Sequence, residues 1–196
     1  MQILEPLPTI SVTWSGACAD GMAAGEGTLV WTYRDFEGAE QSSSFTGTLR
    51  GGLPQGKGAI VLASGDSYAG EWVDGMKSGP GVMLFANGDR YDGEWKDDSQ
   101  NGKGVYVWAN GDRYEGDWVN DDQSGHGTYT FANGFTYVGE WAAGARNGQG
   151  RITWPDGKYY EGPFVDDLAH GIGECKGPDG TVGKCEFVNG EFSRWL

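Results

Sequence analysis

The chain has 196 residues, a formal net charge of −14, 36 glycines and an aromatic content of 13%. So acidic a chain lacks the basic face that nucleic acid requires, and its charge also disfavours binding to anionic membranes. The aromatic content excludes a disordered glycine-rich linker, and the lack of a three-residue glycine period excludes collagen. Glycine combined with aromatic residues is typical of β-structure with frequent turns.

Residues 1–13 are expected to form an N-terminal cap. The stretch from Met1 to Ile10 lacks the basic start and apolar core of a signal peptide, and it contains two prolines. The apolar residues of Leu4–Pro8 are expected to cover an open sheet edge.

From there on the sequence repeats. Five tyrosines are spaced by 23 residues, and each precedes a glycine by two positions and a tryptophan or phenylalanine by four. Further glycines follow each tyrosine at 11, 13 and 20 positions. Such self-similarity is the signature of a repeat architecture. The tyrosines are Tyr68, Tyr91, Tyr114, Tyr137 and Tyr160.

The same register extends in both directions. Phe45 and Trp14 open earlier units, and Gly183 opens a truncated one. The chain therefore consists of seven full units and one partial unit over 14–190. The first unit carries an insertion at 34–44, which we expect to be a protruding exposed loop, and 191–196 is expected to form a C-terminal cap.

These residues resemble a known family. The run Tyr91-Asp-Gly-Glu-Trp95, followed by Gly102-Lys-Gly104 and Ala109-Asn-Gly111, is similar to the MORN (membrane occupation and recognition nexus) repeat. The resemblance covers nearly the whole chain and implies tandem β-hairpins, while function transfers only weakly. Departures fall in the terminal units, where Phe45 and Gly183 replace tyrosine and Cys18, Leu49 and Phe187 replace tryptophan.

Each unit is expected to contain two strands. The first is the Tyr-x-Gly-x-Trp run, and the second is typified by Gly104–Trp108. A loop such as Asn120–Gly125 joins them, and an Ala-Asn-Gly hairpin turn joins successive units. The predicted fold is all-β: a single-layer, elongated, twisted antiparallel meander of tandem β-hairpin repeats of the MORN type.

Alternation of side chains along each strand defines two faces. The inner face takes the tyrosine, the glycines, the tryptophan and two bulky residues of the second strand. We infer that the glycines make room for the rings, and that the sheet curls to bury all of these rings against each other.

The outer face carries a row of acids beside small apolar residues, which suits a basic or amphipathic partner. The alternative is an ordinary solvated strand face. The residues of this candidate partner face are Glu71, Glu94, Asp117, Glu140, Leu84, Val105 and Val107.

No catalytic, cofactor-binding or metal-binding residues are predicted. His126 and His170 occupy different positions of their units and are interpreted as loop residues. The Gly-x-Gly pairs lack the Lys-Ser/Thr of a phosphate loop. Acidic pairs such as Asp121-Asp122 lack the ligand spacing of a calcium loop, and no cofactor is expected.

Cys175 and Cys185 are placed on the inner face of adjacent strands, symmetrically about Gly180, and form a candidate disulfide. Direct opposition would suit a disulfide, whereas a shift of one residue pair would make them less suitable diagonal neighbours. Two buried free thiols are the alternative. A disulfide would favour an extracytoplasmic, oxidising location over the cytoplasm. Cys18 is expected to fill a core position.

The sequence predicts a non-catalytic scaffold for protein–protein interaction or assembly, with a protein partner or self-association and no nucleic acid. One alternative is a membrane or phospholipid adaptor, which the net charge of −14 disfavours. Another is a carbohydrate-binding module, or a regulatory module of an enzyme supplied by another chain.

Overall fold

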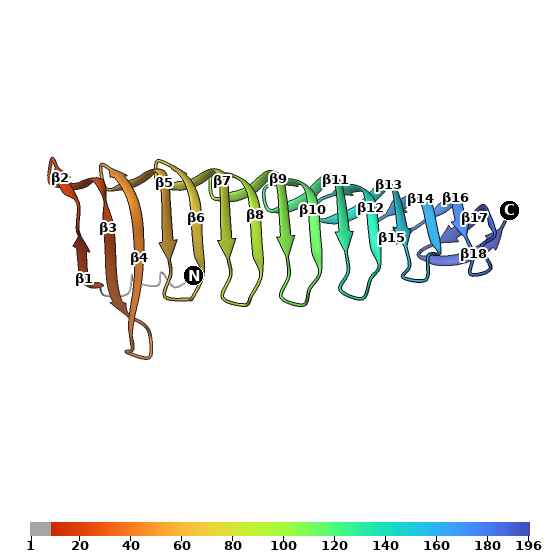
Figure 1. Ribbon diagram of the computed structural model, residues 1–196, viewed down its shortest axis with the longest axis horizontal. Helices are drawn as coiled ribbons and strands as arrows, with labels where there is room; N and C mark the ends of the chain where they lie inside the picture. The colour runs from red at the N-terminus through yellow and green to blue at the C-terminus, as the bar shows by residue number, and fades with distance from the viewer. Residues whose placement is uncertain (1–8) are drawn as a thin grey trace, which may run out of the picture. The chain divides into compact units, whose positions relative to one another are not determined.

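Residues 9–196 are described by a computed structural model, and every regular element among them is a β-strand (Figure 1). The eighteen strands follow one another as an antiparallel meander, which confirms the all-β hairpin architecture expected from the repeats. This part of the chain contains no helix that could cross a membrane. The predicted cap residues of Leu4–Pro8 lie outside the described residues.

The chain divides into two compact units. Among the described residues, the first takes 9–90 together with 95–98, and the second takes 91–94 together with 99–196. Strand β8 (Arg90–Lys96) has residues in both. The other strands of the first unit are β1 (Thr9–Trp14), β2 (Ala17–Ala19), β3 (Met22–Arg34), β4 (Glu40–Arg50), β5 (Leu53–Val61), β6 (Ser67–Val73) and β7 (Met76–Leu84). The other strands of the second unit are β9 (Ser99–Val107), β10 (Arg113–Val119), β11 (Asp122–Thr130), β12 (Thr136–Ala142), β13 (Ala145–Thr153), β14 (Tyr159–Val165), β15 (Leu168–Ala169), β16 (Gly171–Lys176), β17 (Val182–Val188) and β18 (Glu191–Trp195).

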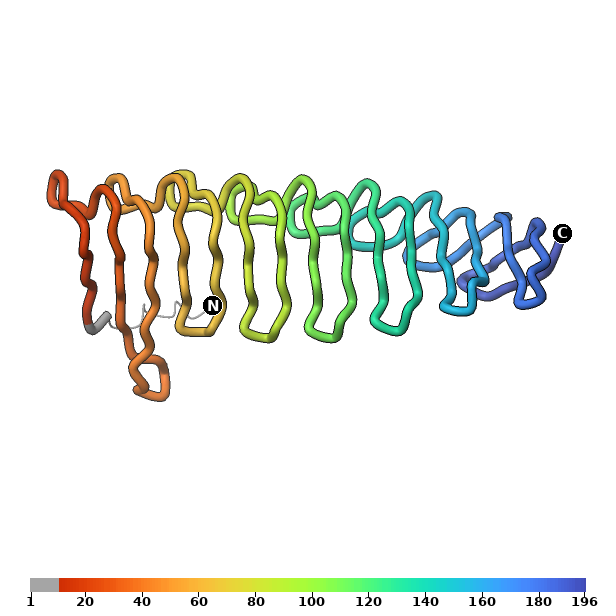
Figure 2. The backbone as a smooth tube through the Cα atoms, in the orientation of Figure 1, coloured from red at the N-terminus to blue at the C-terminus, as the bar shows by residue number. Residues whose placement is uncertain are grey.

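The register of the strands sorts the side chains into rows. In the second unit Tyr114 lies opposite Tyr129, and Gly116 lies between Gly104 and Gly127 of the two neighbouring strands. Rings and glycines therefore share one face in separate rows, as the spacing predicts. In each unit the hairpins also bend over at one end (Figure 2).

Tyr114 illustrates the core. Its side chain is 0% exposed, and its ring meets Trp118 and Trp141 edge to face with ring centroids 5.1 Å apart in both pairs. The Tyr114 hydroxyl donates a hydrogen bond to the Asp117 carbonyl at 3.0 Å, and the Trp118 indole N–H donates to the Gly104 carbonyl at 3.2 Å. Burial raises the pKa of Tyr114, so the hydroxyl remains protonated and donating at physiological pH. The same hydroxyl-to-carbonyl bond recurs at Tyr68, Tyr91, Tyr137 and Tyr160.

The glycine rows leave the space that the rings fill. A Cβ atom on Gly116 would lie 2.6 Å from the Cα atom of Gly127 and 2.6 Å from the His126 carbonyl oxygen. A Cβ atom on Gly127 would collide with the ring of Tyr114. Separations this short are not tolerated between heavy atoms that are not bonded, so these positions accept only hydrogen. The inference that glycine makes room for the rings is confirmed.

The loop predicted at Asn120–Gly125 is shorter in the structure, so its predicted length is wrong. Only Asn120 and Asp121 form the turn, with φ of 49° and 70°, and β11 already begins at Asp122. Two residues of positive φ make the tight hairpin turn that matches the twist of a sheet. The Asp121 carboxylate accepts a hydrogen bond from the Gln100 amide at 2.7 Å, so the acidic turn is tied to the preceding hairpin.

The turns at the other end of the hairpins are linked in a similar way. The Asp112 carboxylate accepts a hydrogen bond from the Ala132 amide at 2.8 Å, and this bond lowers the pKa of Asp112. The two partners are 20 residues apart, and the same spacing recurs in the first unit. In the next repeat, Phe135 takes the place of Asp112 and has no acceptor group, and Pro155 takes the place of Ala132 and has no amide hydrogen to donate.

The insertion at 34–44 protrudes as predicted (Figure 2), but it is mostly strand, so only the prediction of a loop conformation is wrong. Strands β3 and β4 cover all of it except the turn Asp35–Ala39. Ser43 is only 4% exposed, and its hydroxyl accepts a hydrogen bond from the Ala63 amide at 2.9 Å. The extra residues lengthen one hairpin of the first unit, which extends past its neighbours in that unit (Figure 2).

The terminal strands depart from the repeat. Near the start, the ring of Trp14 covers Gly16 and Gly27 in the way that a tyrosine does elsewhere. At the other end β18 pairs with β17, and all five of its residues are exposed. The roles of 1–13 and 191–196 as caps stay predictions.

Candidate functional site

The acids of the predicted partner face are partly used by the fold. Asp117 accepts a hydrogen bond from the His126 amide at 3.0 Å, and Glu140 accepts one from the Gln149 amide at 3.0 Å. Lys103 forms an ion pair with Asp117, and this contact lowers the pKa of that carboxyl. These bonds bridge the strand irregularity that follows each glycine row, which is a structural reason for the acidic row.

The other members of this face are more open. Glu71 and Leu84 belong to the first unit, where Leu84 is 46% exposed. Glu94 is exposed in the second unit, whereas Val105 and Val107 are partly exposed. Whether a partner uses this face stays a prediction.

A hollow of about 640 Å³ lies on the outer face of the second unit. Gly104, Gly116 and Gly127 contribute backbone to it, and side chains of both charges surround them. The side chains include Asp92, Lys103, Val105, Glu115, His126 and Val138. Only Val105 of the predicted partner face lines this hollow.

The inner face of the second unit carries a further feature, here named the aromatic strip. Two of its rings come from the ends of strands β9 and β11, and the other four come from the turns that follow β9, β11 and β13. All six are partly exposed, so the expectation that every inner ring is buried is wrong. The strip consists of Tyr106, Trp108, Tyr129, Phe131, Phe135 and Trp154.

The rings of the strip form an unbroken series of contacts. Centroid distances are 4.5 Å from Tyr106 to Trp108 and 5.2 Å from Trp108 to Tyr129. They are 4.4 Å from Tyr129 to Phe131 and 6.4 Å from Phe131 to Phe135. Phe135 in turn lies 6.1 Å from the final ring, so the strip extends across three consecutive repeats.

The repeat itself does not require aromatic residues at these positions. In the first unit the corresponding positions hold Ile60, Leu62 and Met83 beside a single aromatic residue, Phe85. The buried tryptophans, such as Trp118, donate their indole N–H to a backbone carbonyl. Within the described residues the indole N–H groups of Trp108 and Trp154 have no such partner. The strip therefore combines apolar area with free donors.

A pocket of about 280 Å³ adjoins the C-terminal end of the strip. Trp154 lines it together with Phe187, Phe192 and Trp195, and Lys158 stands among the lining residues. Phe192 and Trp195 are 49% and 44% exposed, which is uncommon for such large apolar side chains. The strip and the pocket share Trp154 and so form one continuous aromatic surface of the second unit.

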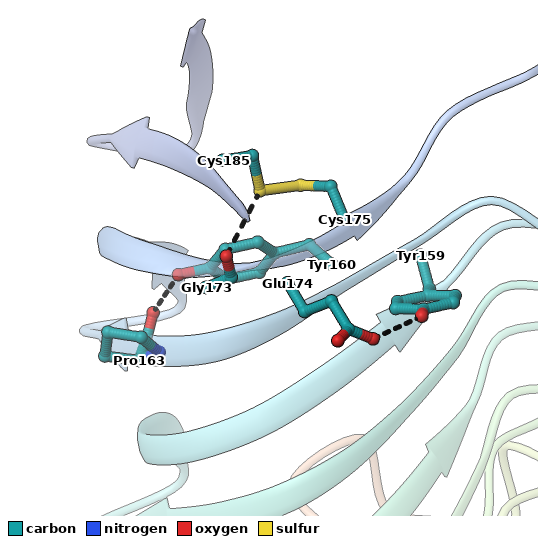
Figure 3. Close-up of a disulfide and its surroundings, with 7 residues drawn as sticks. All are labelled: Tyr159, Tyr160, Pro163, Gly173, Glu174, Cys175 and Cys185. Atoms are coloured by element: carbon teal, nitrogen blue, oxygen red, sulfur yellow. Dashed lines mark hydrogen bonds between the residues drawn. A yellow bond between two sulfur atoms is a disulfide. The ribbon is translucent and has the colours of Figure 1, made fainter. Parts of the chain in front are cut away.

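The structure joins Cys175 and Cys185 as a disulfide beside Tyr160 (Figure 3). The two are diagonal neighbours, because Cys175 lies opposite Gly183 and Cys185 lies opposite Gly173. The two cysteines are therefore not directly opposite each other, which was the arrangement that the sequence analysis considered more suitable for a disulfide. The Cα atoms are nevertheless 5.8 Å apart, within the range of disulfides.

Thiol titration tests this bond. In denatured, unreduced protein made under oxidising conditions, one thiol per chain, that of Cys18, is expected to react, and three are expected after reduction. In the matched variant Cys175→Ser two should react without reduction, because Cys185 loses its partner. Three reactive thiols in the unreduced wild type would contradict the disulfide.

Two further sequence expectations are wrong. Cys18 does not fill a core position and is exposed, because β2 pairs with β3 alone and has only three residues. His126 is a strand residue on the outer face, whereas His170 lies between β15 and β16 as expected for a loop residue. The His170 ring accepts a hydrogen bond from the Asn189 amide at 3.4 Å.

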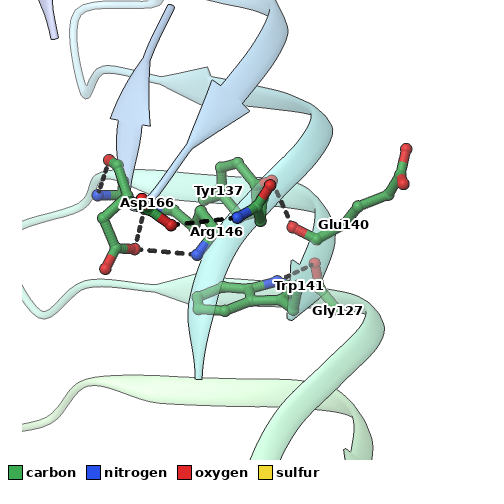
Figure 4. A network of polar contacts seen from close by, with 8 residues as sticks. Gly127, Tyr137, Glu140, Trp141, Arg146 and Asp166 are labelled. Atoms are coloured by element: carbon green, nitrogen blue, oxygen red, sulfur yellow. Dashed lines mark hydrogen bonds and ion pairs between the residues drawn. The ribbon is translucent and has the colours of Figure 1, made fainter. Parts of the chain in front are cut away.

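The acidic turns hold the fold together. Arg146 donates from its side chain to the Asp167 carboxylate at 3.0 Å, and its guanidinium lies 5.6 Å from the centre of the Tyr137 ring (Figure 4). The neighbouring Asp166 accepts a hydrogen bond from Asn147 at 3.3 Å. Across residues 9–196, no group of three or more histidine, cysteine or acidic side chains could hold a metal ion.

The repeats of this chain match a known protein family. The family model of the MORN repeat matches six consecutive segments, which together span residues 45–182 and so more than half of the chain. The chain is a MORN-repeat protein. A search of curated proteins found no match. The matched segments are 45–67, 68–90, 91–113, 114–136, 137–159 and 160–182.

The MORN repeats start at the positions that the sequence spacing identified, from Phe45 onward. The partial unit after 182 and the unit before Phe45 lie outside the match, so both stay predictions. MORN repeats are generally non-catalytic repeat modules, commonly associated with interactions or with membranes. Sequence reasoning placed five of the strip residues on the inner face but not Phe135, and it missed the exposure of all six. The available signal was the run of aromatic residues in consecutive repeats at positions where the first matched repeat has Ile60 and Leu62.

Proposed function

We propose that this MORN-repeat protein is a non-catalytic binding module that holds a segment of a partner protein along the aromatic strip. The observation that carries the proposal is the series of six partly exposed rings in contact across three repeats. Aromatic residues supply large contact area at little cost in conformational entropy, and they are enriched in the cores of interfaces. The fold accepts aliphatic residues at these positions elsewhere, so stability alone does not account for the rings.

Two further observations support this surface. The unpartnered indole N–H groups of Trp108 and Trp154 can donate to backbone carbonyls of a bound segment. The 280 Å³ pocket next to Trp154 offers a concave anchor for one apolar side chain. A second copy of the chain is one candidate partner, because self-association would cover the same rings.

The outer face is a second candidate, favoured by the 640 Å³ hollow that Val105 and Val138 line. A phospholipid adaptor remains an alternative, which the net charge of −14 opposes. Carbohydrate binding on exposed rings, or regulation of an enzyme supplied by another chain, are further alternatives. Vesicles of anionic lipid provide the contrasting probe, and salt-resistant binding to them would favour the adaptor.

The experiment compares three immobilised proteins in native affinity capture with quantitative mass spectrometry. The wild type is expected to retain a protein that the variant Trp108→Ala/Trp154→Ala retains about 10-fold less, because each tryptophan contributes contact area and a donor. Val138→Ala, which changes a residue 53% exposed on the outer face, should retain it fully.

The same capture also identifies the surface that is used. Loss of the partner from Val138→Ala but not from the tryptophan variant would transfer the function to the outer face. Equal retention by all three proteins would contradict both surfaces. Unfolding curves of the variants establish that each is folded before capture.

A further inference from the structure

We propose that the segment bound by the aromatic strip is proline-rich and adopts the polyproline II conformation, with proline at every third residue. This inference rests on the function proposed above and names the class of partner. It follows from the spacing of the rings, from the free indole donors and from the charge beside the strip.

The spacing of the strip is set by the hairpin. Neighbouring strands lie ~4.8 Å apart, so equivalent rings on successive hairpins recur every ~9.6 Å. In the strip the recurring position is occupied by Trp108, Phe131 and Trp154. A polyproline II helix has three residues per turn and advances ~9.3 Å per turn. Every third residue of such a segment therefore meets an equivalent ring, and the mismatch stays below ~1 Å over three repeats.

Other regular conformations match this spacing less well. An extended strand returns to the same face every second residue, about 6.7 Å, and so loses register after one repeat. An α-helix returns after seven residues, about 10.5 Å, and drifts by about 1 Å per repeat. Of these three conformations, polyproline II has the period that is closest to that of the array.

The indole donors fit the same conformation. A polyproline II segment has no internal hydrogen bonds, so its carbonyl groups are available to a donor. Trp108 and Trp154 each present an indole N–H that has no partner within the described residues. Two hairpins separate them, which corresponds to about six residues of the bound segment. Proline rings also pack well on flat aromatic side chains, which is how proline-rich segments are recognised elsewhere.

The charge beside the strip gives the segment a second feature. The Tyr129 hydroxyl donates to the Asp112 carboxylate at 3.0 Å, which places this acid at the margin of the strip. The Ala132 amide lowers the pKa of Asp112, so the group is ionised at neutral pH. Lysine or arginine next to the proline run would complement this charge and the net charge of the chain.

The test uses a displayed library of random twelve-residue peptides, selected on the whole wild-type chain. Bound phage are counter-selected on Trp108→Ala/Trp154→Ala, so that only peptides that need the strip survive. The surviving peptides are expected to carry proline at every third position with a flanking lysine or arginine. A synthetic copy should bind the wild type about 10-fold more tightly than it binds the variant. It should bind Trp108→Phe with intermediate affinity, because that variant keeps a ring and removes the donor.

The outcomes separate this inference from the proposed function. Survivors with apolar residues at helical spacing, or with no proline period, would overturn the polyproline II inference and leave the strip as a binding surface. No survivors after counter-selection would overturn both. A survivor whose affinity is the same for Trp108→Phe and the wild type would contradict the role of the indole donor.

Discussion

Replacing Tyr114 with alanine is expected to lower the free energy of unfolding by about 4 kcal/mol. The ring is 0% exposed and lies edge to face between Trp118 and Trp141, so its removal leaves a cavity between two tryptophans. The surrounding strands are fixed by their own hydrogen bonds and cannot collapse into this space. Denaturant unfolding followed by far-ultraviolet circular dichroism measures the loss.

The matched control is Tyr114→Phe, which keeps the ring and removes the hydroxyl. It loses one hydrogen bond, to the Asp117 carbonyl, and should lower the free energy of unfolding by about 1 kcal/mol. The alanine variant must therefore be several times more destabilised than the phenylalanine variant. Equal effects would mean that the hydroxyl, and not the packed ring, stabilises the core.

Replacing Gly116 with alanine is expected to destabilise the protein by about 2 kcal/mol. Two effects oppose each other at this position. Alanine in a strand gains roughly 0.5–1 kcal/mol over glycine through lower backbone entropy, and overpacking costs roughly 1–3 kcal/mol. The added methyl group would lie 2.6 Å from the Cα atom of Gly127 and from the His126 carbonyl oxygen. Because these are backbone atoms of a paired strand, they cannot rotate away, and the overpacking prevails.

Thr128→Ala is the control for this variant. Thr128 lies on the outer face of the neighbouring strand and is partly exposed, so the change should alter the free energy of unfolding by less than about 0.5 kcal/mol. A Gly116→Ala protein as stable as the wild type would show that the glycine rows are not required by packing. The same urea titration serves for both proteins.

Sequence alone predicted the strand pairing because two constraints coincide. Alternation along the strands assigns Tyr114 and Gly116 to one face, and the 23-residue period repeats that assignment in each hairpin. A register shifted by one residue would place rings opposite the wrong neighbours. Because the same pattern recurs in every repeat, each hairpin indicates the same strand register, and a single hairpin would indicate it only once.

The turns could not be predicted in the same way. Asn120 and Asp121 were assigned to a six-residue loop, because acidic and amide residues are typical of loops in general. Their positive φ values identify a two-residue turn, and the carboxylate is directed at the amide of the preceding hairpin. Such a bond between units depends on the distance between neighbouring turns, which only coordinates give.

The candidate site was predicted least completely. The sequence indicated the inner face for Trp108 and Trp154 but gave no means to separate a buried ring from a half-exposed one. The buried rings are mainly those of the Tyr-x-Gly-x-Trp strands, whereas the partly exposed rings belong to the second strands of the repeats and to the turns after them. The diagonal pairing of Cys175 and Cys185 could not be predicted either. A shift of the register by one residue pair keeps both cysteines on the same face, so the sequence pattern does not distinguish the two registers.

The bonds between turns constrain how such an array can grow. Each of these hydrogen bonds joins an acceptor side chain to a backbone amide 20 residues later, as Asp112 and Ala132 show. A duplicated hairpin therefore carries a copy of the acceptor and a copy of the donor. A copy inserted before residue 135 would form this hydrogen bond with the hairpin before it and with the hairpin after it, and no further substitution would be needed. At Phe135 and Pro155 both halves are absent together, so the neighbouring hairpins at that junction pair without this bond. The lengthening of the chain by gene duplication is thus already provided for in the spacing of its turns.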